Sequence, residues 1–426
     1  MQRLRDRFQS SFLLLPASMT AGIALLAALL TWADAALWGS GVRFGFAGEP
    51  AAARGLLSTI ASSTLTLAGL TFSVTLVVLA LASSQYSPRV LRTFLKDRRT
   101  KMVLGVFLGT YVYALVTLRA VRSADEAAGQ AAFVPGVAMT VAFVLALAAI
   151  GVFVFFIDHV VQSVRIERII GRIAADTRGI IERWYPLEQA SSADASLPGT
   201  VASAAPDTLA ADGRATRAIA AATPAVVSSI DSDALVERAR AVDGLVVVQC
   251  GVGQFVPEGG PLVTVIGTDD DLDPDAFRGP IALSATRTET QDVGFGLRQL
   301  VDIAERALSP GVNDTTTAVQ AVDQIHDLLR RLATRPIPDG RHVDADGILR
   351  VQVPVASWGD LVALALDEIR HWGAKSLQIA QRLHDLLDDL LTVVSDDRAE
   401  PLHRQRRLLV ARLDDELPDV EQAQLH

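Results

Sequence analysis

Four long apolar stretches lie in the first 160 residues, and they limit the folds open to this chain more than any other feature. A helix needs about 20 apolar residues to cross the roughly 30 Å of hydrocarbon in a bilayer. Each stretch is long enough to do so. We therefore expect a transmembrane domain at 1–160 with four α-helices, at about 12–38, 56–82, 102–121 and 133–157.

Basic residues flank these stretches unevenly, and the bias sets the expected orientation. Thirteen Lys and Arg residues lie before the first stretch, between the second and third, and just after the fourth, whereas the other two loops hold four. Positive residues are retained on the cytoplasmic side. We therefore expect a multi-pass protein of the bacterial inner (plasma) membrane, with the lipid bilayer as a partner and with both the N-terminus and the C-terminus in the cytoplasm.

A cleaved signal peptide is the alternative for the first stretch. Residues 33–35 read Ala-Asp-Ala, which resembles a cleavage site. The apolar stretch is long for a signal peptide, and an acidic residue is unfavourable so close to the cut. Cleavage would leave three helices in the same orientation.

Charge divides the chain into a basic part and an acidic part. Residues 1–160 carry 13 Lys and Arg against 7 Asp and Glu, and residues 161–426 carry 26 against 41. Acidic surface repels phosphate backbones, so we expect no nucleic acid partner. The single cysteine, Cys250, excludes an intramolecular disulfide and a thiolate metal site. The seven histidines lack ligand spacing, so we expect no metal and no cofactor.

Hydroxyl and small side chains follow one helical stripe along the second apolar stretch. Such residues permit close helix packing in a membrane, and hydroxyls can also line a pore or a substrate path. Both interpretations remain open. No ionisable residue lies in mid-membrane, which argues against a proton-coupled transporter but not against a passive channel. The stripe consists of Ser58, Ser62, Thr66, Gly69 and Ser73.

The C-terminal part predicts an α+β region in three segments. Residues 161–222 are expected to form a stalk, in which the fourth helix continues to Trp184, followed by a linker. Residues 223–275 alternate strands with turn residues and resemble the small barrel-sandwich folds of biotinyl and lipoyl carriers. Because this segment contains no lysine, covalent biotin or lipoate is excluded there. Residues 276–426 are expected to form a mainly helical domain, with one strand at 348–355.

The densest polar constellation lies at the start of this helical domain. It combines a helix-forming segment with a Ser-Pro-Gly turn and the N-terminus of the next helix, where an anion could bind. Capping and salt bridges are the alternative explanation. The candidate residues are Arg287, Asp292, Arg298, Asp302, Ser309, Asn313, Asp314 and Thr317.

Two motifs resemble a known family. One is Phe72-Ser-Val-Thr-Leu76 followed by Leu81-Ala-Ser-Ser-Gln-Tyr-Ser-Pro-Arg89, and the other is Ala307-Leu-Ser-Pro-Gly-Val-Asn-Asp314. Together they resemble uncharacterised bacterial predicted membrane proteins, the family called domain of unknown function 2254. In that family a Pro often follows the Asn-Asp pair, and here Thr315 takes its place. The resemblance implies an architecture over nearly the whole chain and no chemistry.

Two functions fit these features. The first is an oligomeric channel or passive transport protein, in which the second helix lines the path and the cytoplasmic domain regulates it. Four helices suffice for one subunit of a channel and are too few for most secondary transporters. The second is a membrane-anchored regulatory or scaffold protein whose cytoplasmic domain binds a small ligand or a partner protein. No catalytic constellation is visible, so we expect no enzyme.

Overall fold

The structure, a computed structural model, describes residues 14–37, 46, 48–85, 98–123, 132–163, 165–187, 215–267, 272–288 and 290–416. The chain divides into two compact units, Met1–Arg168 and Ile169–His426, which are called here the N-terminal unit and the C-terminal unit. The positive loop expected between the second and third helices and most of the expected linker lie outside the described residues.

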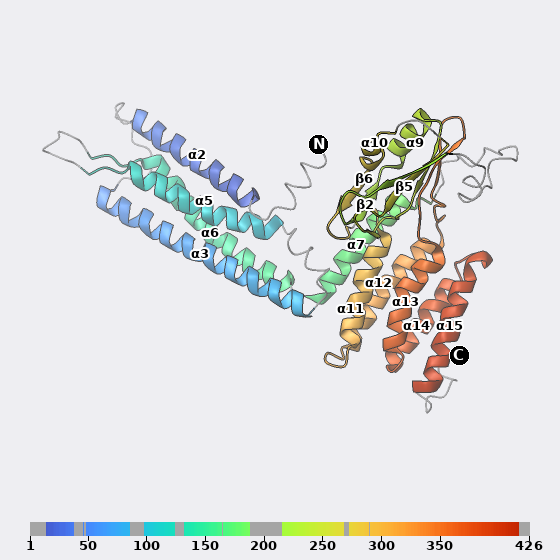
Figure 1. Cartoon of the computed structure of the whole chain (residues 1–426). Helices are drawn as coiled ribbons and strands as arrows, with labels where there is room; N and C mark the ends of the chain where they lie inside the picture. Colours follow the sequence, from blue (N-terminus) through green and yellow to red (C-terminus); the bar gives the residue numbers. More distant parts are fainter. Residues whose placement is uncertain are drawn as a thin grey trace. The chain divides into compact units, whose positions relative to one another are not determined.

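Among its described residues, the N-terminal unit contains four helices that are long and apolar enough to cross a membrane. The prediction of four such helices is confirmed, although α3 and α6 extend beyond their predicted ends. The Lys and Arg residues that predict the orientation lie in the sequence between and beside these helices. The helices are α2 (Leu14–Leu37), α3 (Pro50–Gln85), α5 (Arg98–Ala120) and α6 (Gly136–Ser163) (Figure 1).

Two glycines allow α2 to pack closely against α5. A Cβ atom added at Gly105 would lie 2.8 Å from the sulfur of Met19, and one added at Gly109 would lie 2.3 Å from Cδ1 of Ile23. The Gly-x-x-x-Gly spacing therefore serves a contact within the chain, since small residues let helix backbones approach.

Polar contacts tie α6 to its neighbours at its N-terminus. The carboxylate of Asp34 accepts hydrogen bonds from the amides of Val137 (3.3 Å) and Ala138 (2.9 Å). The hydroxyl of Tyr113 donates to the carbonyl of Ala138 at 3.0 Å. A carboxylate at a helix N-terminus satisfies amides that have no partner within the helix. Asp34 therefore has a structural role at the end of the helix bundle.

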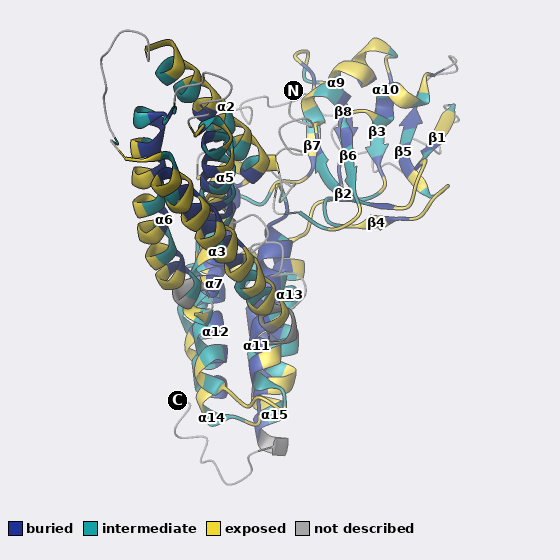
Figure 2. Ribbon diagram, turned by 90° about the vertical axis from the view of Figure 1, so that its left-hand side faces the viewer, coloured by how far each residue is buried: buried dark blue, intermediate teal, exposed yellow. Residues whose placement is uncertain are grey.

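Many residues on the outward surface of this unit are exposed (Figure 2), and they include large apolar side chains. Leu25 and Leu29 of α2 are more than half exposed, as are Ile150 and Val154 of α6. Exposed apolar surface of this extent is typical of a face that contacts lipid.

A separate helix, α7 (Ile166–Trp184), begins just before the boundary of the units, and from Ile169 onward it belongs to the C-terminal unit. The prediction that the fourth transmembrane helix continues unbroken to Trp184 is wrong, because α6 ends at Ser163 and Arg165 is not helical. The sequence of α7 is amphipathic, and its isoleucines are buried. Such a helix packs along one apolar stripe against a soluble core, which explains why its periodicity differs from that of α6.

The strands form two open sheets. One sheet has the order β1-β5-β3-β8-β7 and the other has the order β4-β2-β6. All neighbours are antiparallel except β3 and β8, which are parallel. The strands are β1 (Thr216–Ala220), β2 (Ala225–Ile230), β3 (Leu245–Val248), β4 (Phe255–Val256), β5 (Pro261–Ile266), β6 (Ile281–Ser284), β7 (Arg341–Val343) and β8 (Leu349–Gln352).

These sheets differ from the predicted module in two respects. Strand β1 lies in the segment that was expected to be a linker, and β7 and β8 lie far beyond the predicted end of the module at residue 275. No closed barrel is present among the residues that the structure describes, so the barrel-sandwich detail is not confirmed. Helices α9 (Ser232–Ala241) and α10 (Pro274–Arg278) share one apolar core with both sheets.

Five helices complete the C-terminal unit. They lie side by side in Figure 1. Residues 358–391 form two helices, because the chain turns between Gly373 and Ser376, where the Ser376 amide donates to the Gly373 carbonyl. The helices are α11 (Val293–Leu308), α12 (Thr315–Ala333), α13 (Trp358–Gly373), α14 (Leu377–Leu391) and α15 (Asp396–Glu416).

Candidate functional site

The hydroxyl stripe of α3 lies on the outside of the N-terminal unit. All five stripe residues are exposed, from Ser58 to Ser73. The side of α3 that packs on the other helices carries Leu57, Ile60 and Ala68, which are buried. At 100° per residue the stripe lies on the opposite side of the helix from these residues. Among the residues that the structure describes, the stripe is therefore not used for packing within one chain.

The stripe hydroxyls bond to their own helix. The hydroxyl of Thr66 donates to the Ser62 carbonyl at 2.9 Å, and that of Ser62 donates to the Thr59 carbonyl at 3.1 Å. This back-bonding satisfies each donor without a second helix or water. The hydroxyl oxygens keep further acceptor capacity. The surface is therefore polar enough to border water and small enough to pack against another helix.

The polar constellation at 287–317 is spread along α11 and does not form one site. Asp292 is at the start of α11, Arg298 and Asp302 lie along it, and the Ser-Pro-Gly turn follows its end. A 16-residue helix is about 24 Å long. The structure therefore separates the candidate residues into three groups.

The first group is an ion pair between Arg287 and Asp292. Both guanidinium–carboxylate contacts measure 2.9 Å, and the Asp292 carboxylate also caps α11 by accepting from the Phe295 amide at 2.8 Å. The side chain of Asp292 is 5% exposed. The guanidinium of Arg287 lies 5.4 Å from the ring centroid of Phe295. This geometry indicates a rigid, fully partnered pair.

The turn between β3 and β4 packs directly on this pair. Gly253 has a φ of +84°, and a Cβ atom there would lie 2.2 Å from Oδ2 of Asp292. Only glycine fits both the backbone conformation and the space. Burial and the negative charge of Asp292 raise the pKa of Tyr185, at the end of α7, to about 12. The pair therefore joins the β3–β4 turn to α11.

The second group centres on Arg298 and includes two residues that sequence reasoning missed. Its guanidinium contacts Asp302 at 2.9 Å, Glu305 at 3.5 Å and Glu368 at 2.6 Å. Glu305 could have been found, since positions 298, 302 and 305 share one helix face. Glu368 comes from α13, about 60 residues later, and no local pattern predicts its position.

The third group is a capping turn. Asn313 has a φ of +50°, which asparagine tolerates better than most residues. Asp314 caps α12, accepting from the Thr317 amide at 3.0 Å and the Thr317 hydroxyl at 2.6 Å. These hydrogen bonds hold the pKa of Asp314 below its usual value. Because the chain's own carboxylate occupies the helix N-terminus, the turn supports the capping interpretation over anion binding.

A further polar network links α12 and α14. His326 contacts Arg382 through Nδ1 at 2.8 Å and Asp389 through Nε2 at 2.7 Å. A guanidinium can only donate, so Nδ1 accepts and the proton of the neutral ring is on Nε2. Arg382 also donates to Asp323 at 2.6 Å. Scattered positions in the sequence gave no sign of this network.

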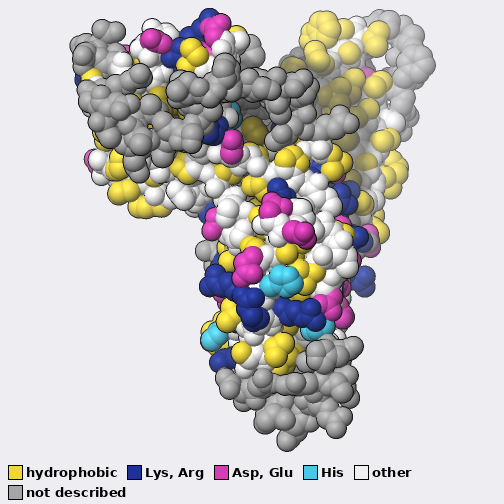
Figure 3. Space-filling view, turned by 90° about the vertical axis from the view of Figure 1, so that its right-hand side faces the viewer, with side chains coloured by type: hydrophobic (Ala, Val, Ile, Leu, Met, Phe, Trp, Pro, Cys, Tyr) yellow, Lys and Arg dark blue, Asp and Glu magenta, His cyan; other side chains and the backbone are white. Residues whose placement is uncertain are grey.

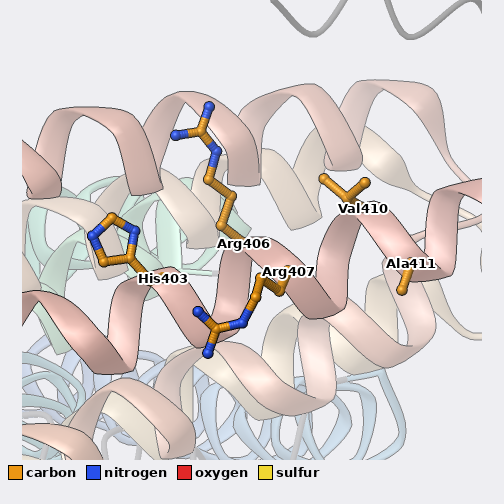
Figure 4. A pocket seen from close by; sticks show the side chains of 5 residues that line it. All are labelled: His403, Arg406, Arg407, Val410 and Ala411. Carbon is orange, nitrogen blue, oxygen red and sulfur yellow. The ribbon is translucent and has the colours of Figure 1, made fainter.

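The surface of the helices mixes acidic, basic and histidine side chains (Figure 3). A shallow hollow on α15 is lined by the residues labelled in Figure 4, His403, Arg406, Arg407, Val410 and Ala411. Both arginines there have acidic partners, Asp388 at 3.3 Å and Glu400 at 2.8 Å respectively. No group of three metal-binding side chains is found within the described part of the chain.

Comparisons with known proteins agree with this architecture. The profile of the family described as "Predicted membrane protein (DUF2254)" matches residues 9–389. Uncharacterised proteins of Mycobacterium bovis and Mycobacterium tuberculosis are each 31% identical to the chain over 368 residues, covering 84% of this chain and 67% of theirs. No solved structure matches. Because the family profile matches most of this chain, the chain belongs to the DUF2254 family of predicted membrane proteins.

Proposed function

We propose that this protein is an oligomeric channel or passive transport protein of the bacterial inner membrane, and not an enzyme. In this proposal α3 of each copy lines a path between copies. The N-terminus and the C-terminal unit are cytoplasmic, and the C-terminal unit regulates the path. The charge bias around the apolar helices supports the orientation.

The position of the α3 stripe carries the proposal. A helix face that contacts only lipid gains nothing from five small or hydroxyl positions, and the outward faces of α2 and α6 instead carry Leu, Ile and Val. The stripe lies opposite the packed side of α3, so a second copy can reach it. A polar lining between copies would use the free acceptor capacity of the hydroxyls.

A membrane-anchored regulatory or scaffold protein is the second candidate. One observation favours it: the Ser62 and Thr66 hydroxyls already donate within α3. A stripe whose donors are satisfied can pack dry against another helix. The channel requires that water reach the stripe at a contact between copies, whereas the scaffold, in which the membrane half is only an anchor, requires no water there.

Thiol labelling separates the two candidates. Single cysteines at Ser62 and Thr66, in a Cys250→Ser background, are treated with a water-soluble thiol reagent in membranes. The controls are cysteines at Ala68, which is buried, and at Leu70, which is exposed on the same helix outside the stripe. A channel predicts fast labelling of the stripe alone, because thiolate forms where water reaches the thiol.

The opposite pattern supports the scaffold. If the stripe cysteines are protected like the cysteine at Ala68, while oxidation cross-links them between copies, the stripe is a dry contact. Equal protection at Thr66 and Leu70 without cross-linking would contradict the channel, since it would place the stripe against lipid.

A further inference from the structure

Around Arg298, in the contact between α11 and α13, carboxyl groups outnumber guanidinium groups. Arg298 of α11 lies within 3.5 Å of carboxylate oxygens from Asp302, Glu305 and Glu368. The Arg298 side chain is 22% exposed, Asp302 9%, Glu305 25% and Glu368 39%. One guanidinium therefore faces three carboxyl groups in a half-buried position.

A proton relieves this imbalance. Two carboxylates that share a site cannot both ionise freely, because like charges repel strongly where water is scarce. Glu305 and Glu368 contact the same guanidinium, at 3.5 and 2.6 Å, so a proton held by one of these two carboxyl groups lowers the repulsion between them. Burial, hydrogen bonding to Glu368 and the charge of Glu368 raise the pKa of Glu305 to about 7.

Charged residues on the neighbouring helix α12 form ion pairs that do not include Glu305. On α12, Asp327 binds Arg178 of α7 at 2.6 Å, and Asp323 binds Arg382 of α14 at 2.6 Å. Arg306, next to Glu305, is exposed to solvent. Among the described residues, the charged groups that act on Glu305 are Arg298, Asp302 and Glu368.

We propose that Arg298, Asp302, Glu305 and Glu368 form a proton-operated switch in the α11–α13 contact of the C-terminal unit. With the proton bound, the hydrogen bond between Glu305 and Glu368 and the ion pair of Arg298 join the two helices. When the proton leaves, three carboxylates surround one guanidinium, and repulsion across the contact loosens it. The switch does not depend on the proposed channel function.

The sign of the pH effect follows from the raised pKa. The ordinary glutamate value is 4.5, and the folded value is about 7. The folded state therefore binds the proton more tightly than the unfolded chain between these values. The stabilisation is complete below the ordinary value and is lost as the pH rises through about 7.

The test combines infrared spectroscopy with thermal unfolding of the full-length protein in nanodiscs from pH 6 to pH 8. We expect a protonated-carboxyl band that disappears with a midpoint near 7 and is absent in Glu305→Gln. Glutamine is neutral, like the protonated glutamic acid, and has nearly the same shape. The Tm of the variant should exceed that of the wild type by a margin that grows as the pH rises from 6 to about 7 and then levels off at a few degrees. Glu400→Gln, in a surface pair with Arg407, is the matched control and should keep the band.

Glu368→Gln supplies an independent result in case Glu305→Gln does not fold. Removal of the neighbouring charge should move the midpoint of the band from near 7 toward 4.5. A band that survives in Glu305→Gln would overturn the proposal. So would a midpoint that Glu368→Gln leaves unchanged, or a Tm difference between Glu305→Gln and the wild type that does not vary with pH.

Discussion

The substitution Gly253→Ala tests how the sheets are joined to the helices of the C-terminal unit. Two costs follow from the structure. An alanine at a φ of +84° loses about 1–2 kcal/mol relative to glycine. The added Cβ atom would also lie 2.2 Å from Oδ2 of Asp292 and 2.9 Å from two nitrogens of Arg287, so the ion pair must move.

The second cost is the larger one. Asp292 is 5% exposed, and separation of a buried carboxylate from its partner costs about 3–5 kcal/mol. Partial relaxation reduces that figure, so we expect a total loss of about 3–5 kcal/mol. For a unit of this size that corresponds to a fall in Tm of roughly 6–20 °C. Thermal unfolding of the full chain, followed by circular dichroism, measures it.

Gly259→Ala is the matched control. Gly259 has a similar φ of +73°, but nothing lies within 4 Å of a Cβ atom added there. This variant should lose only the backbone term of about 1–2 kcal/mol. Equal losses of stability in the two variants would refute the claim that Gly253 is required by its contact with the ion pair.

Three other predictions follow from the structure and the charge pattern. The guanidinium of Arg350 lies 2.7 Å from the buried carboxylate of Asp344, and Arg350→Met leaves that carboxylate without its ionic partner. The substitution should lower the free energy of unfolding by about 3–5 kcal/mol, and adding Asp344→Asn should recover part of the loss. A double variant no more stable than Arg350→Met would contradict this prediction. Asp314→Ala removes the α12 cap and should cost about 1 kcal/mol above pH 5 and progressively less as the pH falls, because the folded pKa of this aspartate is depressed; a loss that does not vary with pH would count against capping. Reporter fusions should place Ala47 outside and Arg98 inside the cell, and a cytoplasmic signal at Ala47 would overturn the orientation.

The membrane helices could be predicted closely because hydropathy is a local property. The stretch predicted at 12–38 became α2 at Leu14–Leu37. The strand predicted at 348–355 became β8 at Leu349–Gln352.

Long-range pairing set the limit of prediction. Strand β8 joins β3 in parallel across about 100 residues, which contain α11 and α12, and no local pattern records that pairing. The sequence analysis missed the break between α6 and α7 because the apolar pattern of α6 is followed directly by the amphipathic pattern of α7, and both patterns predict a helix. Glu305 needed only its helix face to be found, but Glu368 required the packing of α11 on α13.

The stripe on α3 shows the same limit for a candidate site. Its residues and their common helix face were readable from the sequence, but its position opposite the buried Leu57 and Ala68 was not. Which side of a helix packs depends on the surfaces of its neighbours, and every side of α3 contains small or apolar residues.

Blocked flux through the reconstituted protein tests the proposed path most directly. The Thr66→Cys variant, in a Cys250→Ser background, is placed in liposomes, and ion leak is recorded before and after a bulky charged thiol reagent is attached. The account predicts that modification at Thr66 reduces the leak severalfold, whereas the same treatment of Leu70→Cys, exposed outside the stripe, leaves it unchanged. No leak above that of protein-free liposomes, or a leak that modification at Thr66 does not alter, would contradict it.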